Sequence, residues 1–162
     1  MRFTLIDRIT SIDPGKSITA VKNLSLGEEY LQDHFPGFPV MPGVLMVEAL
    51  VQTAAWLMRF EEDFIYSMVL LKGARAVKFV NFVSPGKTLK VTADVQGWNG
   101  AECTFRGNGT VDGESAVSAR LTLERFNLAE RNPRFKESDD LQIRAARELF
   151  AQLWPGVPER PV

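Results

Sequence analysis

The sequence is poor in the residues that bind metals or form covalent cross-links. Its 162 residues include one cysteine, Cys103, and one histidine, His34. A single cysteine excludes an internal disulfide bond, and one cysteine with one histidine cannot form the clustered ligand set of a zinc site. We therefore expect neither a metal centre nor another cofactor.

The sequence also lacks an excess of either charge. Nineteen basic and twenty acidic residues leave a net charge of -1, which argues against a nucleic-acid-binding protein. Asp7 stands where a secretion signal would need an apolar run. With 45% apolar and 24% charged residues, the chain has the composition of one soluble globular domain. We expect a cytoplasmic protein.

Segments rich in β-branched residues predict strands on both sides of an apolar helix. Residues 16–26 read as one strand, and residues 66–80 as one or two strands interrupted at Gly73. Two turn signals follow, Asn99-Gly100 and Asp112-Gly113, which favour tight hairpins. They divide the next part of the sequence into a three-stranded meander at 87–98, 101–111 and 114–125.

Cys103 lies in the middle strand of this meander, two residues before Phe105. We expect a thiol packed in the core rather than a nucleophile, because no second histidine is present to activate it.

Residues 43–58 are the most apolar segment and predict a helix that is buried on most sides. Pro42 is suited to the first helical position. The segment is too short for a membrane span and contains Glu48 and Gln52, so we expect no membrane insertion. Glu48 and Gln52 are four residues apart and therefore share one face of the helix.

Two interpretations of Glu48 stay open from the helix alone. It is either a structural carboxylate satisfied by Gln52 and backbone donors, or a functional acid held in apolar surroundings. The preceding loop favours function. It contains His34, and its prolines, at every third position, make it stiff: Pro36, Pro39 and Pro42.

The loop leads into a helix start at Gly43, where unpaired backbone N–H groups are available. A histidine base, a carboxylic acid and a backbone oxyanion site together suit removal of a proton next to a carbonyl group.

Residues 34–52 read HFPGFPVMPGVLMVEALVQ. This stretch resembles the active-site motif of the β-hydroxyacyl-ACP dehydratases of fatty acid synthesis. The resemblance extends upstream through Leu5-Ile6-Asp7-Arg8 and residues 15–23, and downstream through Lys78-Phe79 and Ser84-Pro85-Gly86. It covers about residues 3–125 and not the remaining tail.

The resemblance implies an α+β hot-dog fold, in which an antiparallel sheet wraps around a long central helix. It also implies a homodimer with composite active sites, and possible assembly as a trimer of dimers. His34 and Glu48 match the catalytic pair, contributed by opposite chains. Gly43 matches the residue whose N–H binds the thioester carbonyl, Val40 the residue whose carbonyl orients the histidine, and Gln52 a neighbour of the acid.

The implied reaction is dehydration of a (3R)-3-hydroxyacyl thioester, carried by an acyl carrier protein (ACP) or by coenzyme A (CoA), to a trans-2-enoyl thioester. His34 would remove the α-proton, Gly43 would stabilise the enolate oxygen, and a protonated Glu48 would donate to the leaving hydroxyl group. Fatty acid synthesis or a related lipid pathway would use this product.

The sequence departs from the family pattern in three places. Asp33 stands where a glycine usually precedes the histidine, and it adds a negative charge beside His34. Val80-Asn81-Phe82 replaces two basic residues and a proline, and Lys87 replaces an acid. Other basic residues suggest either a patch for an acidic carrier or a scattered solvated surface: Arg59, Lys72, Arg75, Lys78, Lys87 and Lys90.

Two other functions compete with the dehydratase. A hot-dog thioesterase would use the helix carboxylate to activate water, although the proline-rich loop argues against it. A non-catalytic subunit that binds acyl thioesters would keep the motif without turnover.

The tail begins a different pattern at residue 127. We divide the chain into a hot-dog domain at 1–126 and an extension at 127–162, either part of the same domain or appended to it. Ser138-Asp139-Asp140 predicts the N-cap of an amphipathic helix over about 138–154, which Pro155-Gly156 ends. Such a helix usually packs on its own domain.

Overall fold

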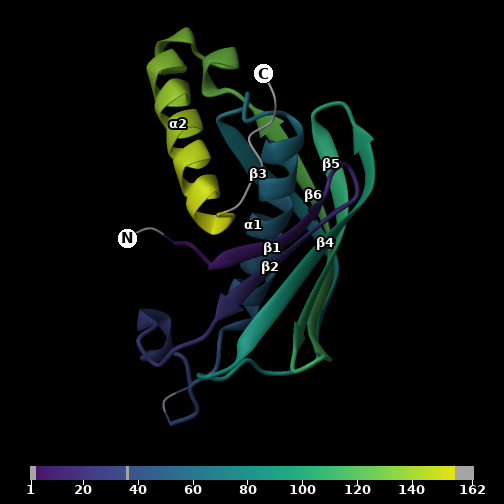
Figure 1. Ribbon diagram of the computed structural model, residues 1–162, viewed down its shortest axis with the longest axis vertical. Helices are drawn as coiled ribbons and strands as arrows, with labels where there is room; N and C mark the ends of the chain where they lie inside the picture. Colours follow the sequence, from purple (N-terminus) through teal and green to yellow (C-terminus); the bar gives the residue numbers. More distant parts are fainter. Residues whose placement is uncertain (1–2, 36, 156–162) are drawn as a thin grey trace.

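The computed structural model describes residues 3–35 and 37–155, in which six antiparallel strands wrap around one long helix (Figure 1). The sheet order is β1-β2-β4-β5-β6-β3, so β1 and β3 form its edges. This confirms the predicted α+β hot-dog architecture. The strands are β1 (Arg8–Asp13), β2 (Ser17–Asn23), β3 (Met68–Phe79), β4 (Thr88–Asn99), β5 (Glu102–Val111) and β6 (Glu114–Phe126).

The predicted meander corresponds to β4, β5 and β6, which pair in sequence order. Gly100 and Gly113 have φ of 59° and 86°, as tight hairpin turns require. Cys103 is fully buried, and this burial raises its pKa to about 12, consistent with a core thiol. The interruption expected at Gly73 is only a shift in register, because β3 runs through it as one strand against β6.

The central helix α1 (Gly43–Glu61) is longer than predicted at its C-terminal end. Pro42 is its N-cap, with extended backbone, and not its first helical residue. With 19 residues, α1 is long and apolar enough to cross a membrane by length and composition alone, so the prediction that it is too short was wrong. Instead, 56% of it is buried inside the protein, as expected for a core helix.

The tail contains helix α2 (Lys136–Leu153), preceded by the short 3-10 helices η2 (Leu128–Glu130) and η3 (Pro133–Phe135). The predicted N-cap at Ser138-Asp139-Asp140 was wrong, because the helix begins two residues earlier and Phe135 precedes it. Residues 156–162, including Gly156 of the predicted stop, lie outside the described residues.

Asp139 is buried and joins the tail to the sheet domain. Its carboxylate accepts hydrogen bonds from the backbone N–H of Leu128 (2.9 Å) and Ala129 (2.8 Å), and from the hydroxyl group of Ser67. Burial alone would raise the pKa of Asp139, but these hydrogen bonds outweigh it and lower the pKa. Asp139 therefore caps η2 rather than α2.

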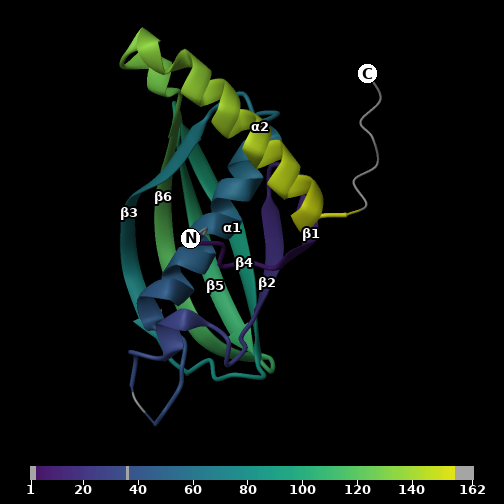
Figure 2. The ribbon, with the colours of Figure 1, turned by 90° about the vertical axis from the view of Figure 1, so that its left-hand side faces the viewer.

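Helix α2 lies over α1, on the side away from the sheet (Figures 1 and 2). Phe150 is 6% exposed and stands at the centre of their contact. Its ring lies 5.1–5.8 Å, between ring centroids, from four others: Trp56, Phe60, Phe64 and Trp154. The tail thus shares an apolar core with the central helix.

We expect Phe150→Ala to lower the free energy of unfolding by about 3–5 kcal/mol, because it leaves a cavity among four aromatic rings. Urea denaturation followed by tryptophan fluorescence measures this loss. Leu141→Ala, at an exposed position of the same helix, is the control and should change stability by less than about 1 kcal/mol. Equal effects of the two variants would contradict this role for the cluster.

Candidate active site

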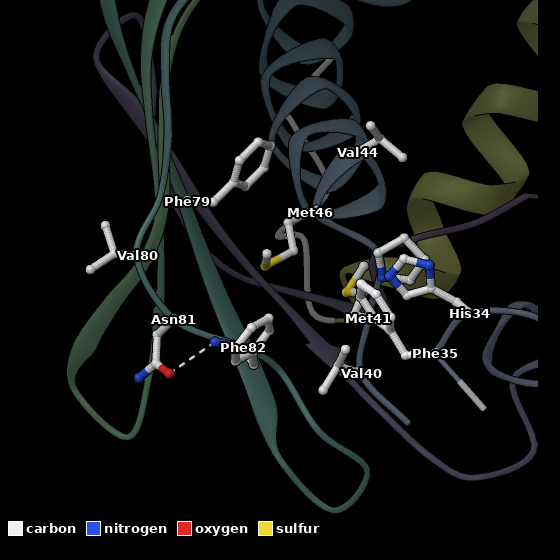
Figure 3. Close-up of a pocket in the computed structure, with 12 residues that line it drawn as sticks. His34, Phe35, Val40, Met41, Val44, Met46, Phe79, Val80, Asn81 and Phe82 are labelled. Atoms are coloured by element: carbon white, nitrogen blue, oxygen red, sulfur yellow. Dashed lines mark hydrogen bonds between the residues drawn. The ribbon is translucent and has the colours of Figure 1, made fainter. Parts of the chain in front are cut away.

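A cavity of about 440 Å³ opens at the N-terminal end of α1 (Figure 3). The loop before α1 forms one wall, and the segment after β3 forms the opposite wall. Most of its lining is apolar, as in a site that binds an acyl chain. The lining residues are His34, Phe35, Val40, Met41, Pro42, Gly43, Val44, Met46, Phe79, Val80, Asn81 and Phe82.

His34 is partly buried, and its ring lies 4.3 Å from the ring of Phe35. Among the described residues, the imidazole forms no hydrogen bond within this chain. Val40 is buried and lines the same cavity, but its carbonyl is not hydrogen-bonded to His34 here. Pro36, the first proline of the loop, lies outside the described residues. The imidazole is therefore available to a bound molecule.

Gly43 places the helix N-terminus on the cavity wall. The backbone N–H groups of Leu45 and Met46 both donate to the carbonyl of Pro42, at 2.9 and 3.2 Å. Within the part of the chain that the structure describes, the N–H of Gly43 has no protein acceptor. This donor, at the positive end of the helix dipole, suits a developing negative charge on oxygen.

Phe79 approaches Gly43 closely enough to exclude any other residue there without a rearrangement. A Cβ atom at Gly43 would lie 2.9 Å from Cε1 of the Phe79 ring. This contact joins the end of β3 to the start of α1. Phe79 was part of the family resemblance, but the sequence did not predict its contact with Gly43.

Glu48 is partly buried on α1 and does not line the cavity that contains His34. Its Oε1 accepts a hydrogen bond from Nε2 of Gln52 (3.0 Å). The Gln52 amide also donates to the carbonyl of Phe3 (2.9 Å) and accepts from the N–H of Leu5 (2.9 Å). Gln52 thus fixes both the carboxylate and the segment that precedes β1.

Within one chain, the predicted site residues form two separate groups. His34, Val40 and Gly43 share the cavity, whereas Glu48 and Gln52 lie further along α1. Five residues separate Gly43 from Glu48, which places them about 140° apart around the helix.

Edge strand β3 and the loop after it leave apolar side chains exposed from the start of the strand to the cavity wall. They are Leu70, Leu71, Val77, Phe79, Val80 and Phe82, together with Val44 at the start of α1. An exposed apolar strand edge is a typical pairing surface for another chain.

The model of the FabA-like domain family matches residues 1–120 of this chain. The chain belongs to the FabA-like family. Among curated proteins, a 3-hydroxyacyl-ACP dehydratase FabZ of Polynucleobacter asymbioticus is 46% identical over 123 residues, covering 74% of this chain and 80% of that protein. The FabZ of Listeria welshimeri is 38% identical over 126 residues, covering 78% and 88%.

Solved structures share the fold of this FabA-like protein at low sequence identity. The dehydratase heterocomplex ApeI:P of Xenorhabdus doucetiae aligns with a TM-score of 0.67 and 18% identity, over 83% of this chain and 90% of that chain. A mutant thioesterase of Pseudomonas aeruginosa aligns with a TM-score of 0.60 and 16% identity, over 75% and 81%. At these identities the likeness supports the fold alone.

The basic residues grouped from the sequence do not form one patch. Arg59 points inward, where its guanidinium group donates to the carbonyls of Tyr66 and Ser67. Lys72 pairs with Glu102, and Lys87 with Asp112. Of these six basic residues, only Arg75, Lys78 and Lys90 are exposed and form no ion pair among the described residues.

Proposed function

We propose that this FabA-like protein removes water from 3-hydroxyacyl-ACP to give trans-2-enoyl-ACP in fatty acid biosynthesis. The observation that carries the proposal is the pairing of His34 with the free N–H of Gly43 in one apolar cavity. A base and an oxyanion donor on the same cavity suit proton removal next to a thioester carbonyl.

His34 takes the proton from C2 as that C–H bond breaks, and the thioester oxygen gains negative charge facing Gly43. The electron pair then forms the C2–C3 double bond, and the C3–O bond breaks. A protonated Glu48 supplies the proton with which the hydroxyl group leaves as water. The hydrogen bond from Gln52 to Glu48 positions the carboxyl group for this donation.

The separation of Glu48 from His34 within one chain supports a homodimer as the active form. In such a dimer, the cavity of His34 would be completed by the partner subunit's Glu48. The unpaired β3 edge offers a surface where two copies can continue one sheet. We place the dimer in the cytoplasm.

The direct test is turnover of 3-hydroxyacyl-ACP, beside the matching CoA thioester, with enoyl product followed by mass spectrometry. Formation of the enoyl thioester supports the proposal, and the ratio of the two rates identifies the carrier. Release of a free thiol would favour a thioesterase instead. Tight binding of the thioester without turnover would favour a non-catalytic subunit.

We expect activity to return when two inactive variants are mixed. His34→Ala and Glu48→Gln subunits, unfolded together and refolded, form mixed dimers in which one of the two composite sites is intact. Random pairing then restores roughly a quarter of wild-type turnover. Each variant refolded alone is the control, and a mixture no more active than either one would contradict the composite site.

A further inference from the structure

Three arginines stand side by side on the face of the sheet opposite α1. Arg106 on β5 is directly opposite Arg120 on β6, and Arg120 is directly opposite Arg75 on β3. All three are exposed. A Cβ atom at the next residue, Gly107, would contact Leu50 of α1, so Arg106 points away from the helix. We call these three residues the arginine row.

The arginine row is not neutralised within the chain. None of its members takes part in an ion pair among the described residues, although Asp94 is the register partner of Arg106 on β4. Glu102 and Glu124 lie four residues away along β5 and β6, and Glu102 pairs with Lys72. Like charges directly opposite one another destabilise a sheet, so the row costs stability in the absence of a partner.

The row lies close to the cavity. Arg75 precedes Phe79 of the cavity wall by four residues, at most roughly 13 Å along a strand. Exposed Lys78 is opposite Ser118, which is two residues from Arg120, so it extends the positive charge towards the cavity. Glu102 and Glu124, two acidic residues on this face, lie towards the other end of the strands, away from the cavity.

We propose that the arginine row is the docking surface for an acidic face of the acyl carrier protein. This inference rests on the proposed dehydratase function. The row spans two strand spacings, roughly 10 Å, on the exposed face of the sheet, and none of its members lines a described cavity. Such a surface matches carboxylates spread over a protein better than the phosphates of CoA, which need an enclosing pocket.

The test compares R75E/R106E/R120E with R8E/R134E/R144E, a control triple that makes the same change of charge at exposed arginines elsewhere. Reversal of all three charges in the row keeps the repulsion between neighbours, so the fold should be retained. Three 3-hydroxyacyl thioesters serve as substrates: the ACP, CoA and N-acetylcysteamine forms.

For the row variant, we expect KM with the ACP substrate to rise by at least about tenfold, with turnover of the small N-acetylcysteamine thioester unchanged. The control triple should behave as wild type. An unchanged KM for the ACP substrate would overturn the proposal. So would an equal rise for the CoA substrate, which would indicate phosphate recognition.

R120Q is a milder test of the same surface, because it removes one charge and is assayed by binding of acyl-ACP instead of by turnover. Removal of the central charge relieves repulsion, so Tm should not fall, while the affinity for acyl-ACP in a calorimetric titration should fall about threefold or more. Equal affinities of wild type and R120Q would count against the row.

A wild-type protein inactive on all three thioesters would contradict the dehydratase function, whereas the titration would still test docking.

Discussion

His34→Ala is expected to lower kcat on 3-hydroxyacyl-ACP by about 10²–10⁴-fold, the usual contribution of a general base. The imidazole lines the cavity and has no hydrogen-bond partner among the described residues, so its loss removes the proton acceptor without breaking a structural contact. The free energy of unfolding should stay within about 0.5 kcal/mol of wild type.

Steady-state kinetics and urea denaturation of the same preparation measure both effects. Gln32→Ala is a matched control, since Gln32 is exposed two residues earlier in the same loop. Wild-type turnover in His34→Ala would exclude this residue as the base. A loss of turnover that matched a loss of stability would assign His34 a structural role.

Glu48→Gln is expected to reduce kcat by about 10²–10⁴-fold as well, because an amide cannot deliver the proton that the leaving hydroxyl group needs. The substitution keeps the size of the side chain and an oxygen that can still accept the hydrogen bond from Gln52. The binding of substrate, which does not depend on this proton, should change far less than kcat.

The control for this variant is Glu61→Gln at the C-terminal end of the same helix. Glu61 accepts a hydrogen bond from the N–H of Gly15, far along α1 from Gly43, and should not affect kcat. If Glu48→Gln retained wild-type kcat, a group other than Glu48 would have to protonate the hydroxyl group. A rise in KM alone would assign Glu48 to substrate binding.

The sequence predicted the elements whose signals are local. Asn99-Gly100 and Asp112-Gly113 specify hairpins through their own backbone preferences, so the meander of β4, β5 and β6 followed from a few residues. The central helix followed from one long apolar segment. β3 pairs with β6 through residues that lie 38 to 58 positions apart, from Phe79–Val117 to Met68–Phe126. Local residue patterns carry no signal for pairing over such separations.

Asp139 shows why local signals also mislead. Its position before an amphipathic stretch is typical of an N-cap, and the prediction used that rule. In the structure, its carboxylate binds Ser67 and the start of η2 instead. A buried carboxylate takes whichever donors the fold presents, and those donors come from segments that the rule does not consider.

The candidate site was only partly predictable for the same reason. The resemblance assigned His34 and Glu48 to opposite chains but gave no arrangement within one chain, where His34 and Gly43 share a cavity and Glu48 lies further along α1. The contact of Phe79 with Gly43 comes from a strand end thirty-six residues away and had no counterpart in the motif itself. Residue types thus indicate the chemistry, while their arrangement depends on long-range packing.

The contacts of Phe150 with aromatic rings on and just after α1 also bear on folding during synthesis. On the ribosome, the whole sheet and the central helix emerge before residues 136–153 do. Until then, Trp56, Phe60 and Phe64 lack the ring that packs against them. The nascent chain therefore presents an aromatic surface, of the kind that chaperones bind, until α2 has left the exit tunnel.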